Sequence, residues 1–232
     1  MSAHPRTLHT RPTTPLQHDP SVERPEVTGA ESGPESPFPV YLEGWVTRGF
    51  GRGSKDLGCP TANLPDSSID PYATTLQTGV YYGYARVLDP PDHPQNSLEF
   101  STSASSSSSS TPCPHDQVWP MVMSIGWNPF YKNRSRTAEV HILHDYPHDF
   151  YGKELRVVML GFIRPEYNYS SMDALIKDIN TDKEVSLRSV SRPAYTPFAQ
   201  DPFFTRESRL EEPKEDPNKV REKPTMEERE KL

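Results

Sequence analysis

The sequence predicts a mainly β protein, built as a small closed or nearly closed antiparallel barrel that is followed by one helix. Five or six strand-like segments follow one another, and their connections are rich in turn residues. No long helical segment separates them, whereas parallel strands need long crossover connections. A single segment near the C-terminus has helical spacing, which places the helix after the sheet.

The predicted strands are rich in aromatic and β-branched residues, which suit a pleated and half-buried surface. In the segment 137–143, alternation places Ala138, Val140 and Ile142 on one face. The other face then carries Glu139, His141 and Leu143. The predicted strands are 41–50, 78–88, 118–127, 137–143 and 153–164.

The predicted helix covers residues 171–179, "SMDALIKDI", in which apolar side chains recur at helical spacing. Ser170 or Ser171 is placed to cap its N-terminus, and Asp173 falls in the first turn. This is the one segment in which we expect a helix of ordinary length.

The composition divides the chain into one domain and two tails. Residues 1–36 hold almost no large apolar side chains, so we expect a disordered N-terminal extension. Residues 37–205 form the predicted barrel domain, interrupted by a disordered Pro/Ser-rich insertion at 89–117. Residues 206–232 alternate acidic and basic side chains and are predicted to be a solvated tail.

Charge and cysteine content exclude several classes of protein. The formal net charge of −7 argues against a general nucleic-acid binder, and no apolar run is long enough to suggest a membrane span. Cys59 and Cys113 form neither a disulfide framework nor a metal motif. We therefore expect a reducing compartment, the cytoplasm, with mitochondrial import as a minor alternative. We also expect a monomer.

Residues 49–65, "GFGRGSKDLGCPTANLP", combine four glycines with Arg52 and Lys55. The spacing matches neither the P-loop nor the G-x-G-x-x-G loop. Glycines still let a backbone approach a polyphosphate closely. In an extended segment Thr61 and Asn63 share a face, and their oxygens are ligands that Mg²⁺ accepts. A flexible hairpin loop with ordinary turn hydrogen bonds explains the pattern about as well.

Three further patterns have competing interpretations. Glu139 on a strand suits a general base, although an ordinary solvent-facing glutamate is the more common case. The histidines at 141, 144 and 148 suggest zinc only on a helix, which Pro147 disfavours. Lys132, Arg134 and Arg136 fit either a phosphate or nucleic-acid contact or a basic surface turn.

Several motifs occur together and in a fixed order. They are "RGFGRGSKDLGCPTANLP", "TGVYYGYARV", "MVMSIGWNPFYKN", "EVHILHDYPHDFYGKELRV" and "GFIRPEYNY". This ordered set closely resembles the riboflavin kinases, or flavokinases, and especially their stand-alone eukaryotic form. The resemblance covers about residues 40–190, and "DPFF" at 201–204 is similar to the usual end of the family's core.

The resemblance implies a six-stranded antiparallel Greek-key barrel with a C-terminal helix. It implies transfer of the γ-phosphoryl group of ATP to the ribityl 5′-hydroxyl of riboflavin, giving FMN and ADP, with Mg²⁺, or alternatively Zn²⁺, as the metal. Thr61 and Asn63 match its metal-binding residues, and Glu139 matches its catalytic carboxylate. The resemblance also implies nucleotide contacts at Gly49, Lys55, Thr61, Ile142, His144 and Tyr151, and a flavin contact at Arg164.

Two other classes of function are compared with this one. A non-catalytic flavin- or nucleotide-binding barrel would be expected to lose Glu139 or the Thr61–Asn63 pair, and this chain keeps them. A single-strand nucleic-acid binder would have a basic groove lined by aromatic residues, whereas this chain is acidic. One departure from the family pattern is Tyr167, which stands where the family often has lysine.

Overall fold

The structure is a computed structural model that describes residues 16–49, 59–88, 117–127, 136–213 and 216. The expectations about Lys55, Lys132 and Arg134 lie outside the described residues. So do those about residues 1–15, nearly all of the 89–117 insertion and most of the 206–232 tail.

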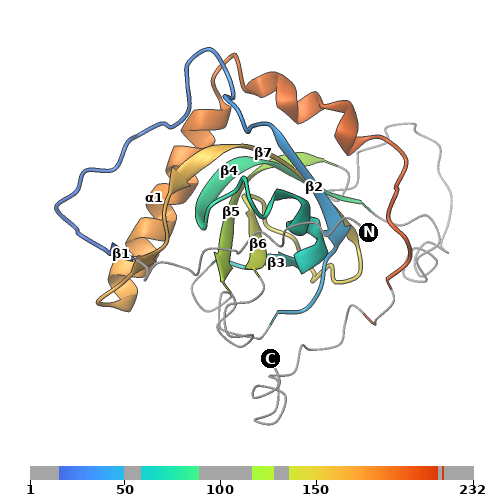
Figure 1. Ribbon diagram of the computed structural model, residues 1–232, viewed down its shortest axis with the longest axis horizontal. Coiled ribbons are helices and arrows are strands. Elements are labelled where there is room, and N and C mark those ends of the chain that lie inside the picture. Colours follow the sequence, from blue (N-terminus) through green and yellow to red (C-terminus); the bar gives the residue numbers. More distant parts are fainter. Residues whose placement is uncertain (1–15, 50–58, 89–116, 128–135, 214–215, 217–232) are drawn as a thin grey trace, which may run out of the picture.

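A six-stranded antiparallel sheet forms the body of the protein, with strand order β2-β7-β4-β5-β6-β3. The order β7-β4-β5-β6 is a Greek key, because β7 returns to lie beside the first strand of a three-strand meander. The sheet curls until its two edges meet at an antiparallel bridge between Thr47 and Asn63 (Figure 1). The predicted mainly β, nearly closed barrel is therefore confirmed. Its strands are β2 Val40–Trp45, β3 Ala62–Leu64, β4 Gly79–Leu88, β5 Val118–Trp127, β6 Arg136–Ile142 and β7 Glu154–Arg164.

The burial pattern of the strands shows which part of the sheet is covered on both sides. Strands β2 and β6 alternate between buried and half-buried residues, so only their inner face is packed. Strands β4 and β7 are buried almost throughout, because their outer face carries a second apolar cluster. The inner cluster, which includes Leu42, Met121, Met123 and Val157, fills the barrel interior. Among the described strands, the outer faces of β2 and β6 therefore remain partly open to solvent, whereas β4 and β7 are covered on both sides.

The helix α1 runs from Met172 to Val190 and packs over the outer face of β4, β5 and β7 (Figure 1). The predicted cap is confirmed, since the Ala174 amide donates to the Ser171 hydroxyl oxygen at 3.2 Å. The helix extends beyond the predicted end at residue 179. Its second half buries polar as well as apolar side chains, including Asp182, Ser186 and Ser189, so apolar spacing fades there.

Short elements complete the fold, and most were not predicted. β1 Leu16–Gln17 pairs in parallel with β8 Tyr167–Asn168. The four described 3₁₀ helices are η1 Asp66–Ser68, η2 Asp70–Tyr72, η6 Thr196–Gln200 and η7 Pro202–Phe204. No helix in the described part of the chain is long and apolar enough to cross a membrane.

Residues 16–36, called the N-terminal arm below, pack against the domain, whereas the sequence analysis expects disorder for residues 1–36. The Tyr82 hydroxyl donates to the Thr28 carbonyl at 2.9 Å, and Arg192 and Tyr195 each donate to carbonyls of the arm at 2.9 Å. A Cβ at Gly29, where φ is +83°, would lie 2.4 Å from the Tyr82 hydroxyl. Polar side chains of the domain thus hold the backbone of the arm. The low apolar content of the arm does not predict these contacts, because they do not involve its own side chains.

Candidate active site

The outer face of the sheet carries the candidate polar residues in one row. Asn63 on β3 lies opposite Glu139 on β6, which lies opposite Ser124 on β5. The row continues through Val80 on β4 to Arg164 on β7. Residues directly opposite in an antiparallel pair have Cβ atoms about 4.5–5.5 Å apart. The Asn63 amide and the Glu139 carboxylate are therefore immediate neighbours on rigid strands.

Two cavities lie near this row and share Thr61, two residues before Asn63. A cavity of about 300 Å³ lies between the outer face of the sheet and α1, and we call it the sheet–helix cavity. A second cavity of about 120 Å³, the loop cavity, is bordered by the loop that follows β6. Thr61 lines both cavities. The sheet–helix cavity is lined by Cys59, Thr61, Val80, Val122, Ser124, Glu139, His141, Arg164, Glu166, Tyr167, Leu175, Ile179, Asp182 and Lys183.

Gly49 shows why a glycine precedes the phosphate-binding candidates. A Cβ at this position would lie 2.7 Å from Nδ2 and 3.0 Å from Oδ1 of Asn63. The missing side chain lets the backbone at Gly49 lie directly against the Asn63 amide. Gly49 and Asn63 thus lie together, as expected for parts of one site.

The loop cavity brings together Ile142, His144 and Tyr151, which the sequence analysis assigns to one ligand. The His144 ring stacks on Trp119 with ring centroids 4.1 Å apart and the planes inclined by 6°. The Arg48 guanidinium lies 4.5 Å above the Tyr151 ring centroid. This wall is aromatic and apolar, which suits a flat heteroaromatic group.

His141 has a role that the sequence analysis does not anticipate. Its Nδ1 lies 2.8 Å from the Pro60 carbonyl oxygen, so the ring N–H donates to the residue directly before Thr61. Burial lowers the pKa of His141 despite this hydrogen bond, which favours the neutral imidazole. The sequence does contain one sign of this role. His141 lies two residues after Glu139 on the same face of the strand, so it is near the segment that contains Thr61.

The three histidines considered for zinc do not lie together. His141 lines the sheet–helix cavity, while His144 and His148 line the loop cavity. In the part of the chain that the structure describes, no three His, Cys, Asp or Glu side chains are grouped as a metal site. Oxygen ligands from Thr61 and Asn63 are the remaining candidates for holding a metal, together with groups of a bound ligand.

Arg164 stands at the far end of the row and is buried on the cavity wall. It donates to Asp182 of α1 at 2.7 Å and to the Pro165 carbonyl at 3.0 Å. Its guanidinium lies 5.3 Å from the ring centroid of Tyr167, which lines the same cavity. The predicted ligand contact is thus placed on the cavity wall, with part of its hydrogen-bonding capacity used by the protein.

Glu166 is a second carboxyl in the cavity that the sequence analysis missed. Burial raises the pKa of Glu166, with the Glu139 charge adding to the shift and the Arg164 charge opposing it. A Cβ at Gly126 would lie 2.4 Å from Glu166 Oε1, so this glycine leaves room for the carboxyl. Burial also raises the pKa of the Cys59 thiol, which keeps this cavity residue protonated at neutral pH.

Arg136 fits neither of the two interpretations of the basic turn, because it is neither an available phosphate or nucleic-acid contact nor an exposed surface residue. The side chain is buried and donates to the Leu76 carbonyl at 2.5 Å, with its guanidinium 6.0 Å from the Trp127 ring centroid. It begins strand β6 and therefore points into the domain. Arg136 ties β6 to the segment before β4 and has no exposed cation to offer a ligand.

Comparison with known proteins agrees with this geometry. The family model described as riboflavin kinase, or flavokinase, matches residues 36–190. A riboflavin kinase of Pyricularia oryzae is 53% identical over 178 residues, covering 76% of this chain and 84% of the relative. One of Emericella nidulans is 47% identical over 197 residues, covering 76% and 89%.

The fold is shared with a solved structure. The crystal structure of riboflavin kinase from Trypanosoma brucei is similar with a TM-score of 0.54, at 23% identity, covering 76% of this chain and 95% of that one. At this identity the likeness bears on the fold, and the family model and the fungal relatives carry the assignment. On these grounds, this chain belongs to the riboflavin kinase family.

Proposed function

We propose that this protein catalyses the ATP-dependent phosphorylation of riboflavin at its ribityl 5′-hydroxyl, giving FMN and ADP. The observation that carries the proposal is the pairing of Asn63 with Glu139 where two cavities meet at Thr61. A phosphoryl-transfer enzyme needs its phosphate-binding groups beside the group that orients the acceptor hydroxyl. The register of two neighbouring strands supplies that arrangement.

The loop cavity is the proposed site of ATP. Ile142, His144 and Tyr151 would surround the nucleotide, while Gly49 and Lys55 approach its phosphates. Gly49 supports this assignment because its backbone already lies against Asn63. The triphosphate would then extend past Thr61 toward the row of polar side chains, because Thr61 borders both cavities.

Thr61 and Asn63 are the proposed protein ligands of a divalent metal ion. Both offer neutral oxygens, and the Gly49 backbone packs directly against the Asn63 amide. Such a ligand pair suits Mg²⁺, which takes its other ligands from phosphates and water, better than Zn²⁺, which prefers nitrogen and sulfur. A bound Mg²⁺ would neutralise charge on the transferring phosphoryl group.

The sheet–helix cavity is the proposed site of riboflavin. Val122, Leu175 and Ile179 provide an apolar surface for the flavin ring, and Arg164 provides a cation at the far end. The ribityl chain would lead back along the row to Glu139. This orientation follows from the order of residues across the sheet, with Glu139 nearer to Asn63 than Arg164 is.

Glu139 is the proposed general base. It would accept a hydrogen bond from the 5′-hydroxyl and take its proton as the oxygen–phosphorus bond forms. The bond between the γ-phosphorus and the β,γ-bridging oxygen breaks, and ADP carries away that electron pair. Because the transition state is loose, proton transfer comes late, and much of the contribution of about 10²–10⁴-fold is alignment.

The decisive experiment measures FMN formation by the purified protein with riboflavin, ATP and Mg²⁺, after chromatographic separation of the flavins. Glu139→Gln keeps size and polarity, so we expect kcat to fall by about 100-fold or more while MgATP still binds. Glu184→Gln, on the exposed side of α1, is the matched control and should retain activity. Riboflavin binding without turnover by the folded wild type would instead support a non-catalytic flavin-binding barrel.

We also propose that the protein acts as a monomer in the cytoplasm. The two cysteines form no disulfide framework, which suits a reducing compartment. Light scattering of the active protein and localisation of a tagged form test these two points. A protein that is active only at concentrations above the dissociation constant of a dimer would contradict the proposed monomer.

A further inference from the structure

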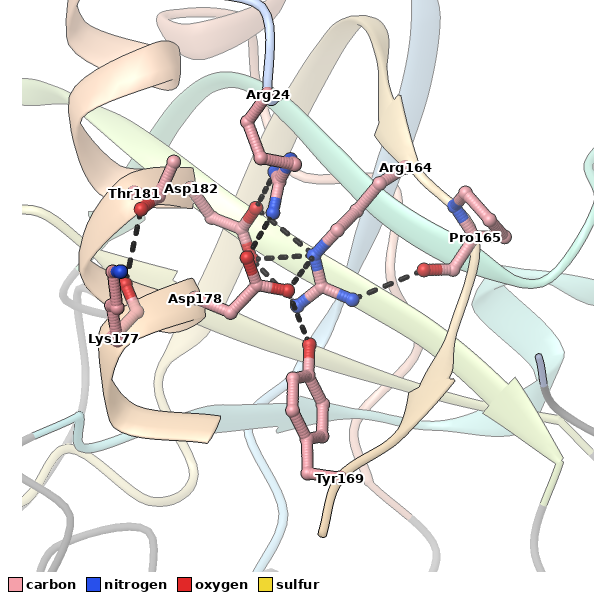
Figure 2. Close-up of polar contacts among 8 residues, drawn as sticks. All are labelled: Arg24, Arg164, Pro165, Tyr169, Lys177, Asp178, Thr181 and Asp182. Carbon is pink, nitrogen blue, oxygen red and sulfur yellow. Dashed lines mark hydrogen bonds and ion pairs between the residues drawn. The ribbon is translucent and has the colours of Figure 1, made fainter. Parts of the chain in front are cut away.

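A cluster of four charged side chains joins the N-terminal arm to the wall of the sheet–helix cavity (Figure 2). Arg24 of the arm forms ion pairs with Asp178 and, at 2.5 Å, with Asp182. Arg164 of β7 pairs with Asp182 at 2.7 Å and with Asp178 at 3.3 Å. The Tyr169 hydroxyl donates to Asp178 at 2.5 Å. Two cations and two carboxylates thus converge from three segments of the chain.

The cluster is buried, so its charge balance matters. Asp178, Asp182 and Arg164 are buried, and the Arg24 side chain is 17% exposed. With both arginines present the two carboxylates are neutralised. Without Arg24, one negative charge would remain uncompensated in the cluster, and a buried charge that loses its partner is strongly unfavourable. Arg164 would then be shared between two carboxylates with no opposing cation to hold them.

The same cluster borders the proposed riboflavin site. Arg164 and Asp182 both line the sheet–helix cavity, together with Tyr167. The arm also contacts the chain that follows Arg164, because Leu16 pairs with Tyr167 and the His18 ring lies 4.9 Å from the Tyr169 ring. The arm therefore supports the segment from Arg164 to Tyr169 from outside, at the end of the cavity farthest from Asn63.

We propose that Arg24 is a positioning residue for riboflavin, acting through Asp178 and Asp182 to fix the Arg164 guanidinium on the cavity wall. The inference rests on the proposed function, because it takes the sheet–helix cavity as the riboflavin site. It gives the N-terminal arm a role in substrate binding. The arm does not line the loop cavity, so the effect is confined to riboflavin.

The first test compares Arg24→Met with Arg192→Met. Arg192 is a matched control because it is similarly buried, with an 11% exposed side chain, and binds the same arm through carbonyls of Gly29 and Ala30. It does not line the cavity. In Arg24→Met we expect the KM for riboflavin to rise about fivefold to tenfold, with the KM for MgATP and kcat within about twofold of wild type. Arg192→Met should leave all three close to wild type, even if its melting temperature falls.

A second test asks whether the KM for riboflavin follows the charge balance of the cluster. A purely structural role of the arm would not produce this dependence. Asp178→Asn combined with Arg24→Met restores one cation and one carboxylate, so it should lower the KM for riboflavin back toward the wild-type value. Arg24→Lys keeps one cation without the fork that reaches both carboxylates, so its KM should be intermediate. The affinity for riboflavin, measured from the quenching of flavin fluorescence on binding, provides the same comparison without turnover.

The outcomes separate this inference from the proposed function. Wild-type protein that makes no FMN would refute the proposed function itself. Active wild type with an unchanged riboflavin KM in Arg24→Met would overturn the positioning role of Arg24. An equal rise in the KM of both substrates, or the same rise in Arg192→Met, would also overturn it, because the arm would then act only through general stability.

Discussion

Replacement of Gly49 by alanine tests whether the glycine-rich segment acts through Asn63. The new Cβ would lie 2.7 Å from Asn63 Nδ2, whereas ordinary contacts begin at 3.4 Å, so the two groups must separate by about 0.7 Å. Displacing a positioning group by about 1 Å can reduce catalysis by about 10²-fold. We therefore expect kcat/KM in Gly49→Ala to fall by about 10-fold to 100-fold. Asn63 is only half-buried, so the melting temperature should change little.

The assay is steady-state FMN formation at several Mg²⁺ concentrations, in a double-mutant cycle with Asn63→Ala. In the Asn63→Ala background the added Cβ meets no amide, so Gly49→Ala should change the remaining activity by less than about twofold. Wild-type kcat/KM in Gly49→Ala would refute the close approach seen here. An equal loss in both backgrounds would show that the glycine serves the loop backbone and does not act through Asn63.

Three other variants test separate parts of the structure. Asn63→Ala removes a proposed metal ligand, so the Mg²⁺ concentration for half-maximal activity should rise, and unchanged Mg²⁺ dependence would exclude this role. Glu166 has a pKa raised above 4.5 by burial, so its charged form destabilises the fold as pH rises through that range. Glu166→Gln should therefore melt like wild type near pH 4 and higher than wild type near neutral pH, and the opposite trend would contradict the burial argument. Ser171→Ala removes the helix cap and should lower the free energy of unfolding by about 1 kcal/mol, or the melting temperature by about 2–4 °C. Thermal unfolding measures this change, and Ser170→Ala is the control because the cap hydrogen bond is made by Ser171.

Period-two alternation made the strands predictable, because each strand has an apolar face in the barrel interior. Residues 118–127 match β5 at both ends, and the alternation assigned to Ala138, Glu139 and Val140 is the one observed. Strands β4 and β7 were found by their aromatic and branched content, although their burial on both faces gives no alternation. Local pattern thus located five of the six strands, since it reports which side chains must leave water. Strand β3, Ala62–Leu64, was considered only as an extended segment, because three residues are too few to show alternation.

The features that were missed depend on polar contacts between distant segments. The middle of α1 buries Asp178 and Asp182, which look like solvent-facing residues until Arg24 and Arg164 are placed beside them. The N-terminal arm is ordered by side chains far along the chain, such as Arg192. A single sequence does not show such pairings, because composition treats each charged residue as solvated.

The candidate residues were identified partly by pattern and partly by resemblance, and the sheet register explains how they are combined. Thr61 and Asn63 share a face by strand geometry, and Glu139 follows from alternation on a different strand. Nothing in either segment says that they are neighbours. The antiparallel register of β3 and β6 places Asn63 opposite Glu139, and a shift of one residue would turn Glu139 into the barrel interior.

This dependence on register explains why the candidate site lies on the outer face of the barrel. The interior is filled by apolar side chains such as Met121, Met123 and Ile125, so polar groups there would lack partners. On the outside, α1 covers β4, β5 and β7, while β3 is an edge strand and β6 lies beside it. The boundary between covered and uncovered strands is where a ligand can be partly enclosed and still enter. Rigid strands there fix the proposed base and metal ligands, and the neighbouring helix and loops line the two cavities proposed to hold the substrates.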